Sequence, residues 1–350
     1  MRKSILVFIL YSLFLIPVQA NSPYLTKVWE YVPAPGQFVN TMPAYEDGDD
    51  ATAMCLKVEE AIGNNNKGMI SLGGWGGYVV FSFDHPVVNV AGQNDFIVEG
   101  NAFYADVTLG AEGGGSCEPG IVMVSKDVNG NGKPDDTWYE LAGSEYSNAK
   151  TIHDYSVTYE RPADGHKATP DPVEKYRIDT THVKWTDNKG KEGYLVQIAF
   201  HKQVYYPQWI SANKLTFAGS RLPDNYEYLN GQYVLYPYTY GYADNHPNDE
   251  FAAQLDIEWA VMADGKPIHL DVIHFVKVYT ALHQQCGMIG ESSTEISGAR
   301  DLHPEAIAPL GIEYVENDHL RCTKMLRNGQ VVIIRNNMNY NPLGILINNY

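Results

Sequence analysis

The residues with the clearest chemical spacing lie between Ile121 and Leu141, in the run D-V-N-G-N-G-K-P-D-D. Oxygen-bearing side chains recur at every second position, with glycines between them, which is the arrangement that a hard cation such as calcium requires. The run matches the first half of an EF-hand loop, but Trp138 replaces the bidentate glutamate of the twelfth position. An unliganded turn rich in Asn and Gly is the alternative interpretation. We predict a calcium site with the residues Asp127, Asn129, Asn131, Lys133, Asp135 and Asp136.

The flanks of this run predict two strands rather than two helices. Ile121 to Val124 is a short apolar run typical of a buried strand, and Thr137 to Leu141 has the β-branched and aromatic content of a returning strand. Pro134 opposes a helix at the exit of the loop because it has no backbone N–H. We therefore expect a β-hairpin clamped by calcium.

Residues 1–20 predict a signal peptide. Arg2 and Lys3 precede an apolar run from Ile5 to Pro17, and the segment ends at the small residue Ala20. A membrane anchor is the alternative, but the apolar run is short for a membrane span. Asn21 follows rather than a cysteine, so no acylation site is visible. We expect an exported protein, at the cell surface or extracellular, with the periplasm as the alternative.

The net charge argues against one class of partner, and the cysteines leave the disulfide pairing open. The formal net charge of -17 becomes -19 without residues 1–20, because that segment carries two positive charges and no negative ones. Such an acidic chain repels phosphate backbones, which argues against a nucleic-acid partner. In an oxidising compartment the four cysteines allow three disulfide pairings, and free buried thiols are equally compatible with a chain of this size: Cys55, Cys117, Cys286 and Cys322.

The composition and the patterning predict a mainly β fold. The chain has 25 Tyr, 31 Gly and 19 Pro, which favours short strands joined by turns. Between Ser71 and Thr280 the apolar residues alternate in short runs without helical periodicity, whereas Ala51 to Ile62 predicts a helix capped by Asp50. We predict a β-sandwich or jelly roll with long loops and few short helices.

The predicted domains follow from the positions of prolines and turn signals. After the signal peptide, residues 21–303 form the β-sandwich ligand-binding domain, and residues 304–322 form a linker marked by Pro304 and Pro309. Residues 323–350 form a small strand-rich tail, in which Asn328-Gly329 is a strong hairpin signal and Asn341-Pro342 marks a second turn.

Two aromatic clusters predict a platform for a small ligand. One is V-Y-Y-P-Q-W at 204–209, and the other is the tyrosine-rich segment 231–245, in which alternate tyrosines would share one face of an extended strand. Aromatic rings with polar edges suit a glycan or a corrin ring, although a packing face of the core is the alternative. The predicted ligand-binding residues are Tyr206, Trp209, Tyr240, Tyr242, Asp244 and Asn245.

A hydrolase and a structural module are the two other classes that we considered. A glycan-processing hydrolase would use paired carboxylates, with Glu291 and Glu295 as candidates and His283 nearby. The sequence contains neither a nucleophile elbow nor an H-E-x-x-H motif, so we assign no catalytic residues. An adhesion or structural module without a small ligand is the third hypothesis.

Several stretches of the chain resemble a family of exported cell-surface proteins from gut Bacteroidetes. The stretches are S-L-G-G-W-G-G at Ser71, D-F-I-V-E-G-N-A-F at Asp95, the segment 118–146, G-Y-A-D-N at Gly241, F-V-K-V-Y-T at Phe275 and the segment 290–303. Some members sit in cobalamin-uptake loci, and the resemblance implies a β-sandwich that binds a ligand such as a corrinoid. This chain departs from the family in lacking a lipidation cysteine.

The tail resembles a different kind of segment. Its N-G-Q turn and its Y-N-x-x-G step at Tyr340 are similar to the C-terminal sorting segments of type IX secretion cargo. The resemblance implies that outer-membrane transport or secretion machinery is a partner, and that the tail is an attachment handle. A strand pair that closes the main sheet is the alternative.

Overall fold

The computed structural model describes residues 21–105 and 112–307, together with the strands of a C-terminal segment. The predicted signal peptide and most of the predicted linker lie outside the described residues. The chain divides into two compact units, Met1–Ala308 and Pro309–Tyr350.

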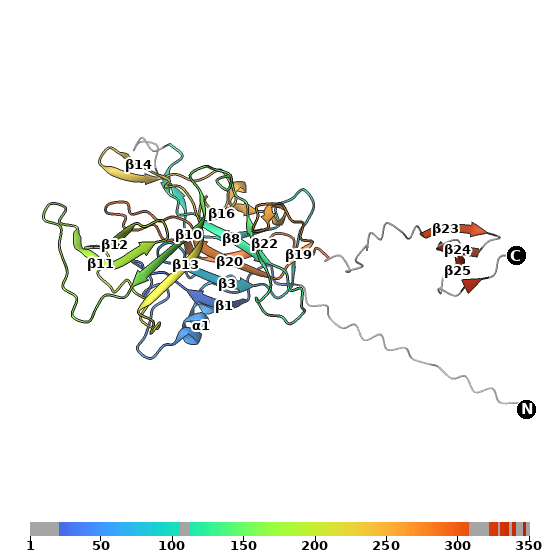
Figure 1. Ribbon diagram of the computed structural model, residues 1–350, viewed down its shortest axis with the longest axis horizontal. Coiled ribbons are helices and arrows are strands. Elements are labelled where there is room, and N and C mark those ends of the chain that lie inside the picture. The colour runs from blue at the N-terminus through green and yellow to red at the C-terminus, as the bar shows by residue number, and fades with distance from the viewer. Residues whose placement is uncertain are drawn as a thin grey trace, which may run out of the picture. The chain divides into compact units, whose positions relative to one another are not determined.

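A seven-stranded antiparallel sheet forms the centre of the first unit (Figure 1). Six strands lie in the order β1-β3-β20-β8-β9-β18, and β16 pairs with β8 in addition. The middle of the sheet joins segments that are far apart in sequence, because β20 pairs with both β3 and β8. The strands are β1 (Lys27–Val32), β3 (Tyr78–Ser82), β8 (Gly120–Ser125), β9 (Trp138–Leu141), β16 (Tyr242–Ala243), β18 (Ala260–Val261) and β20 (Phe275–Thr280).

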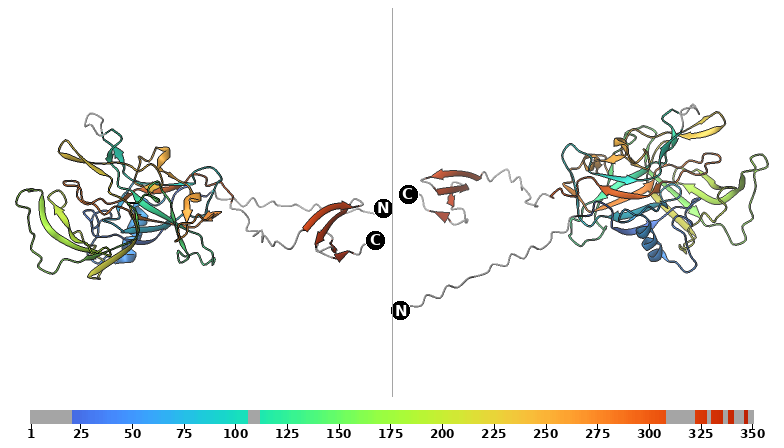
Figure 2. Two further views of the ribbon diagram at one scale, coloured as in Figure 1. Left: turned by 45° about the horizontal axis from the view of Figure 1, so that its top comes forward. Right: turned by 180° about the vertical axis from the view of Figure 1, so that it is seen from behind.

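A second antiparallel sheet packs beside the central one. Its order is β12-β11-β10-β13, and in both views of Figure 2 its green and yellow strands lie at one end of the unit. The strands are β10 (Ile152–Glu160), β11 (Arg177–Asp187), β12 (Glu192–Ile198) and β13 (Lys214–Arg221).

Alternation of side chains on the central strands separates two of the hydrophobic cores of the unit. On β3, Val79 packs into the larger core with α1, whereas its neighbour Tyr78 packs against the core of the second sheet, around Trp75 and Tyr159. Successive residues of a strand point to opposite faces, so this split identifies the central sheet as the layer shared by both cores. The unit is therefore built of packed layers, as in a β-sandwich.

Small sheets and short helices complete the unit. The first small sheet has the order β14 (Tyr226–Leu229), β15 (Gln232–Leu235), β7 (Gly115–Ser116) and β6 (Phe103–Tyr104). A second joins β17 (Gln254–Leu255), β5 (Phe96–Glu99) and β22 (Gly298–Asp301), and two strand pairs join β4 (Val87–Val88) to β19 (Val272–Ile273) and β2 (Ile70–Ser71) to β21 (Glu295–Ile296). The short 3-10 helices are η2 (Phe251–Ala253) and η3 (Ile257–Trp259).

The predicted helix is confirmed as α1 (Ala51–Ile62), the only α-helix among the described residues. The Asp50 carboxylate accepts a hydrogen bond from Ala53 N at 2.9 Å, which satisfies one of the free N–H groups at the helix start. Met54, Val58 and Ile62 recur every four residues and are buried in the larger core. The cap and this apolar stripe explain why the segment is helical.

The mainly β fold class is confirmed, with several antiparallel sheets and few short helices. The hairpin around the predicted calcium loop is also confirmed, since β8 and β9 pair with Val124 opposite Tyr139. The extended strand predicted within the tyrosine-rich segment 231–245 is wrong beyond Leu235, because β15 ends there and residues 236–241 form no strand. Pro237 removes a backbone donor in this stretch, and Gly241 has a φ of +93°.

The second unit contains a four-stranded antiparallel sheet in the order β23-β24-β25-β26. Its strands are β23 (Cys322–Arg327), β24 (Gln330–Arg335), β25 (Met338–Tyr340) and β26 (Leu346–Ile347). Arg327 pairs with Gln330, so the hairpin predicted from Asn328-Gly329 is present, although those two residues lie outside the described ones. The turn predicted at Asn341-Pro342 lies outside them as well.

Across the residues that the structure describes, no helix combines the length and the apolar character needed to cross a bilayer.

Candidate functional site

The first aromatic cluster predicted to bind a ligand lies in the interior. Tyr206 is fully buried; its hydroxyl donates to Ala212 O at 2.9 Å, and the Arg161 guanidinium lies 4.2 Å from its ring centroid. Trp209 is partly buried and stacks on Tyr31 with ring centroids 5.8 Å apart. Both rings therefore support the core in this structure.

The second cluster is divided between the surface and the interior. Tyr240 is 38% exposed and packs on Trp259, whereas Tyr242 is buried and its hydroxyl accepts a hydrogen bond from Glu145 N at 2.9 Å. Asp244 and Asn245 are buried as well. The structure does not bring the six predicted residues together on one exposed face.

Asp244 and Asn245 organise backbone instead. The amide of Asn245 donates to Tyr238 O and accepts from Tyr238 N, each at 2.8 Å, which holds the non-strand segment in place. Asp244 Oδ1 accepts hydrogen bonds from the N–H groups of Asn101 and Ala102 at 2.8 and 2.9 Å. Both side chains accept hydrogen bonds from buried backbone N–H groups. A buried N–H group without a partner would cost free energy.

An exposed aromatic groove lies elsewhere, beside the hairpin β14–β15. We call it the tyrosine groove; its main cavity has a volume of about 420 Å³, and a smaller cavity of about 160 Å³ shares several of its residues. A main cavity of this size lies in the range of small-molecule sites. The residues that line it include Glu174, Tyr176, Tyr228, Gln232, Tyr233, Gly287 and Met288.

The hairpin that carries two of these tyrosines is set by its turn. Leu229 pairs with Gln232, and the two residues between them, Asn230 and Gly231, have φ values of +49° and +86°. Positive φ at both central residues suits Asn-Gly and matches the twist of the flanking strands. Tyr228, which is 63% exposed, then lies edge-to-face with Tyr233 at a centroid distance of 5.0 Å.

A polar wall faces these rings from the loop before β11. Tyr176 donates from its hydroxyl to Glu174 Oε1 at 3.0 Å, and Arg177 Nη1 donates to Glu174 Oε2 at 3.0 Å. The Glu174 carboxylate is thus held by two donors, one on each oxygen. Burial and the neighbouring Glu174 raise the pKa of Tyr176, so its phenol stays a hydrogen-bond donor.

The floor of the groove depends on a glycine. Gly287 has a φ of +55°, and a Cβ at this position would lie 2.7 Å from Tyr233 Cε2. The backbone therefore approaches the Tyr233 ring as closely as only glycine permits. Next to it, Gln285 Nε2 donates to Val196 O at 3.0 Å, which fastens this segment to β12.

Our reasoning from sequence missed the tyrosine groove, although part of its signal was present. The run Y-E-Y-L-N-G-Q-Y-V contains an Asn-Gly pair between alternating tyrosines, which is a strong hairpin signal. Applying it would have predicted exposed tyrosines on β14. The wall at 174–177 and the floor at 285–289 are brought to this hairpin only by the tertiary fold.

The predicted calcium residues do come together in the loop between β8 and β9. Asp127 Oδ1 and Oδ2 accept the N–H groups of Asn131 and Gly132 at 3.1 and 2.8 Å, and Lys133 O accepts from Asp135 N at 2.9 Å. The side-chain amides of Asn129 and Asn131 donate to Asp135, while Asp136 Oδ2 accepts from Val128 N. Gly130 and Gly132 both have a φ of +69° and allow this tight winding.

The donor set of this loop fits a calcium ion. It offers carboxylate, amide and backbone oxygens on an exposed loop, which is the ligand type that calcium takes. The amide oxygens of Asn129 and Asn131 accept from Asn131 N and Lys133 N, and the amide nitrogens of both residues donate to Asp135. These amides lower the pKa of the Asp135 carboxyl, so it is ionised at neutral pH.

Four buried carboxyl groups from distant segments form an interior carboxyl cluster of Glu118, Asp244, Glu291 and Glu295. Glu118 Oε1 accepts from Ser293 N at 3.1 Å, and Asp244 Oδ2 accepts from Glu295 N at 2.9 Å. The Glu291 carboxylate accepts from Gln37 N. Each of these hydrogen bonds joins segments that are far apart in the sequence, so the cluster connects distant parts of the fold.

Burial dominates the electrostatics of this cluster. It raises the pKa of Glu291 to about 8 and that of Glu295 to about 7. Burial, followed by the charge of Glu295, also raises the pKa values of Glu118 and Asp244. A buried carboxyl group without a compensating cation favours its neutral form.

The residues considered for a hydrolase are poorly placed for substrate. Glu291 and Glu295 are only 1% and 2% exposed, and neither lines the tyrosine groove. His283 hydrogen-bonds Tyr155 at 2.8 Å and packs on Trp185, and burial lowers its pKa to about 3. His283 is therefore neutral and belongs to an aromatic cluster.

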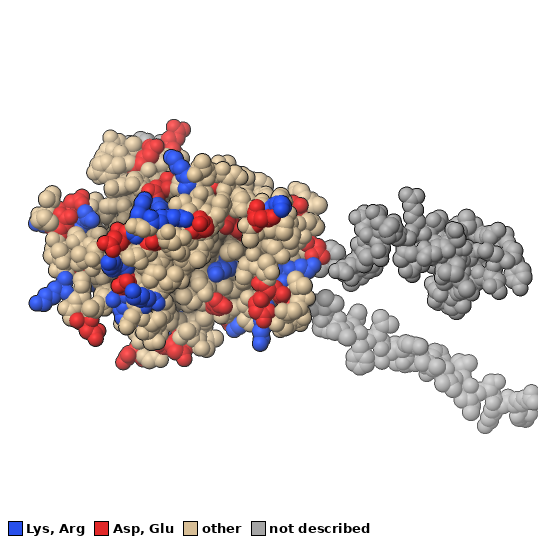
Figure 3. Space-filling model, viewed as in Figure 1, with Lys and Arg blue, Asp and Glu red and all other residues tan. Residues whose placement is uncertain are grey.

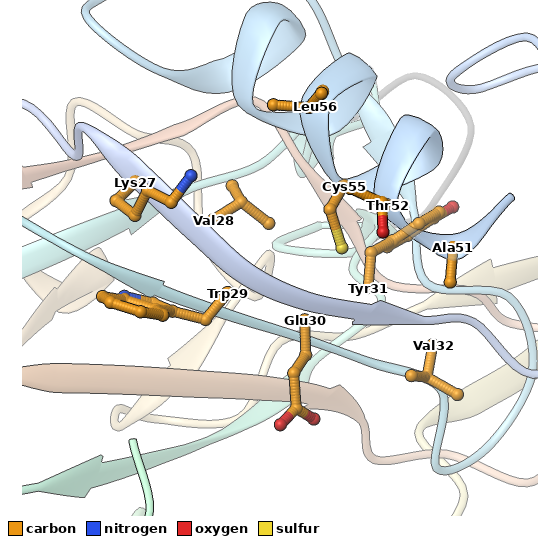
Figure 4. Close-up of a pocket in the computed structure, with 10 residues that line it drawn as sticks. All are labelled: Lys27, Val28, Trp29, Glu30, Tyr31, Val32, Ala51, Thr52, Cys55 and Leu56. Carbon is orange, nitrogen blue, oxygen red and sulfur yellow. The ribbon is translucent and has the colours of Figure 1, made fainter. Parts of the chain in front are cut away.

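A more apolar pocket of about 380 Å³ lies between α1 and β1 (Figure 4). In that view Cys55 extends from α1 toward the strand, whereas Glu30 points to the opposite side of β1. Burial raises the pKa of the Cys55 thiol, so it is not an activated nucleophile. Cys117 and Cys286 are free and buried, so among the described cysteines the structure shows no disulfide.

The charged surface carries no single-sign field on the face seen in Figure 3. On this face, acidic and basic side chains lie next to one another in several groups, with uncharged surface between the groups. This face therefore has no extended positive patch of the kind that tracks a phosphate backbone.

Comparison of the chain with models of known protein families gave no match, and comparison with curated proteins gave none either.

Proposed function

We propose that the chain is an exported, calcium-stabilised surface protein that captures a small ligand in the tyrosine groove. A single observation carries this proposal: tyrosine rings and the Glu174 carboxylate, which is held by a hydrogen bond from Tyr176, line the same cavity of about 420 Å³. We favour a glycan as the ligand, with a corrinoid as the second class to be tested. Export to the cell surface, with secretion machinery acting on the tail, is part of the same proposal.

The chemistry of the groove supports a sugar in particular. Tyr228 and Tyr233 offer aromatic faces and edges, against which the C–H face of a pyranose ring can pack with little loss of entropy. Glu174 and Gln232 lie at the same cavity and can hydrogen-bond sugar hydroxyls. An apolar face beside a few fixed polar groups is the usual composition of a small-molecule site.

Calcium would act on the scaffold rather than on the ligand. Asp127, Asn129, Asn131, Asp135, Asp136 and the Lys133 carbonyl would hold the ion, which would fasten the exposed end of the β8–β9 hairpin. Since β8 also pairs with β20, this hairpin belongs to the middle of the central sheet. A cation there would stabilise the layer on which the rest of the unit is built.

The proposal is tested by titrating the purified mature chain with a panel of oligosaccharides, cobinamide and cobalamin, using calorimetry. We expect saturable binding to one class without turnover. The Tyr228→Ala and Tyr233→Ala variants should each lose at least about tenfold in affinity, because aromatic anchors dominate binding energies. Tyr240→Ala is the matched control, since that ring is also partly exposed but packs on Trp259 outside the groove.

The outcomes separate the classes of protein. Turnover of a glycan would replace the proposal with a hydrolase, and silence across the panel would favour a structural or adhesion module. Equal losses in Tyr228→Ala and Tyr240→Ala would show that the tyrosine groove is not the binding site.

A further inference from the structure

We propose that His166, Asp179 and His182 form a binding site for a divalent transition metal, with zinc as the ion that fits best. One ligand atom from each residue, two imidazole nitrogens and one carboxylate oxygen, lies within 4.8 Å of the others. This inference does not depend on the tyrosine groove or on the calcium loop. It assigns a role to a cluster that neither of them uses.

The site exists because strand β11 is irregular. Asp179 pairs with Gln197 and Val183 pairs with Leu195, so β11 holds two more residues than β12 between these pairs. In a regular strand, residues three apart such as Asp179 and His182 point to opposite faces. The bulge turns both side chains to the same side, and bulges of this kind are over-represented at functional sites.

The carboxylate is fixed so that one oxygen faces the imidazoles. Asp179 Oδ1 accepts hydrogen bonds from Thr169 N at 3.0 Å and from Thr181 N and Oγ1 at 3.1 Å. Asp179 Oδ2 lies 2.7 Å from His166 Nε2 and 3.2 Å from His182 Nδ1. Outer contacts that orient a ligand in this way are typical of metal sites.

The spacing of the three atoms suits zinc. Ligands bound at about 2.0–2.2 Å in a tetrahedron lie roughly 3.3 Å from one another, which is close to the 3.2 Å between His182 Nδ1 and Asp179 Oδ2. All three ligand atoms lie within 4.8 Å of one another. Two histidines and one carboxylate leave one tetrahedral position for water. His166 lies at the exposed edge of the site, which gives an ion access from solvent.

The protonation states also suit a metal. Although burial opposes ionisation, hydrogen bonds from Thr169 and His166 hold the pKa of Asp179 at about 2. Burial lowers the pKa of His182, so its ring is neutral and has a lone pair to offer. The His182 ring is held edge-on against the buried ring of Tyr205, with centroids 4.9 Å apart.

Two other histidine–carboxylate contacts in the structure lack the convergence of ligand atoms found at Asp179. His85 places its two nitrogens on different carboxylates, Asp84 and Asp301, so its contacts diverge. His269 Nδ1 lies 2.8 Å from Glu258 Oε2 and has no second imidazole beside it. Among the described residues only the site at Asp179 brings three such ligands together.

Zinc would fasten the loop that precedes β11. His166 belongs to this loop, and Thr180 already ties it to the strand through two hydrogen bonds to Thr169 O. Lys167 and Lys175 are exposed on the loop and are sites for trypsin. Zinc should therefore slow cleavage after these two lysines.

The test uses the untagged mature chain, stripped of metal and then titrated with Zn²⁺ by calorimetry, with Co²⁺ absorption as the spectroscopic reporter. We expect one zinc ion per chain at this site, and a loss of at least about tenfold in affinity for His166→Gln. His269→Gln is the matched control, because it removes an exposed imidazole at a similar distance from a carboxylate. Zinc should slow tryptic cleavage of the wild type and of His269→Gln, but not of His166→Gln.

Three outcomes would overturn the proposal. One is a wild-type chain that shows neither zinc binding nor the Co²⁺ spectrum. The second is an equal response of the His166→Gln and His269→Gln variants, which would assign the zinc to a different place. The third is faster cleavage of His166→Gln together with wild-type cleavage that zinc does not slow, which would mean that His166 only supports the loop.

Discussion

The predicted calcium loop, residues 127–136, and the interior carboxyl cluster are both rich in acids, but they stabilise opposite forms of the carboxyl group. In the loop, the amides of Asn131 and Asn129 lower the pKa of Asp135. In the interior, burial raises the pKa of Glu291 to about 8. The same functional group is therefore kept charged at the surface and neutral inside, because the cost of desolvating its charge differs.

Because their carboxyl groups differ in protonation, the two regions should respond to different solution conditions. The Asp135 carboxyl of the loop is ionised and exposed, so it is available to a cation, whereas the interior cluster needs no cation when its acids keep their protons. We therefore expect the loop to respond to calcium and the interior cluster to respond to pH. Variants that change one response and leave the other intact test the comparison directly.

The largest expected effect is a loss of stability as the pH rises from 6.5 to 9. An unfolded Glu has its ordinary pKa and is ionised throughout this range, whereas folded Glu291 retains its proton up to about pH 8. The folded state therefore binds more protons, and the free energy of unfolding falls as pH rises, by about 2 kcal/mol for this group alone. Urea unfolding at the two pH values measures the loss.

The Glu291→Gln variant isolates this group because glutamine keeps the shape and the acceptor for Gln37 N but does not titrate. Its unfolding free energy should depend less on pH, by about one proton between pH 6.5 and 8. Glu60→Gln on α1 is the control and should leave the pH dependence of the wild type unchanged. An unaltered pH dependence in Glu291→Gln would contradict the role of burial.

The next effect is the response of the loop to calcium. An ion present at ten times its dissociation constant adds about 1.4 kcal/mol, which raises Tm by about 2 °C in a unit of this size. A calcium-selective chelator should therefore lower the Tm of the wild type but barely affect a double variant with Asp127→Ala and Asp135→Ala. Scanning calorimetry with magnesium as the control ion measures this, and equal sensitivity of both proteins would remove calcium from the hairpin.

The comparison also explains what could be predicted from the sequence. The loop was predictable because Asp127 to Asp136 is contiguous and its spacing alone defines the donor set. Helix α1 was predictable for a similar reason, since Asp50 and the apolar residues after it lie within one short segment. Both features depend on residues that are neighbours in the sequence, so the sequence pattern alone predicts them.

The interior cluster and the tyrosine groove were not predictable in the same way. Glu118 meets Ser293, and Asp244 meets Asn101, only after the sheets have formed. Tyr242 and Tyr206 were expected on a surface because tyrosine suits both exposed strands and cores, and nothing in their local sequence distinguishes the two. The bulge in β11 likewise depends on pairing with β12, so it leaves no clear local signal.

The smallest effect concerns a glycine of the loop. Gly132 has a φ of +69° and open space around its Cα, so Gly132→Ala meets no atom and costs only about 1 kcal/mol of backbone strain. Gly190→Ala is the matched control, because this turn residue between β11 and β12 has a φ of +80° and equally open space. Without calcium the two variants should lose similar amounts of unfolding free energy. With calcium, Gly132→Ala alone should show a smaller rise in Tm, because Gly132 N holds Asp127 Oδ2 at 2.8 Å and strain in this turn displaces a ligand. A full calcium response in Gly132→Ala would show that the winding of the loop does not define the ion site.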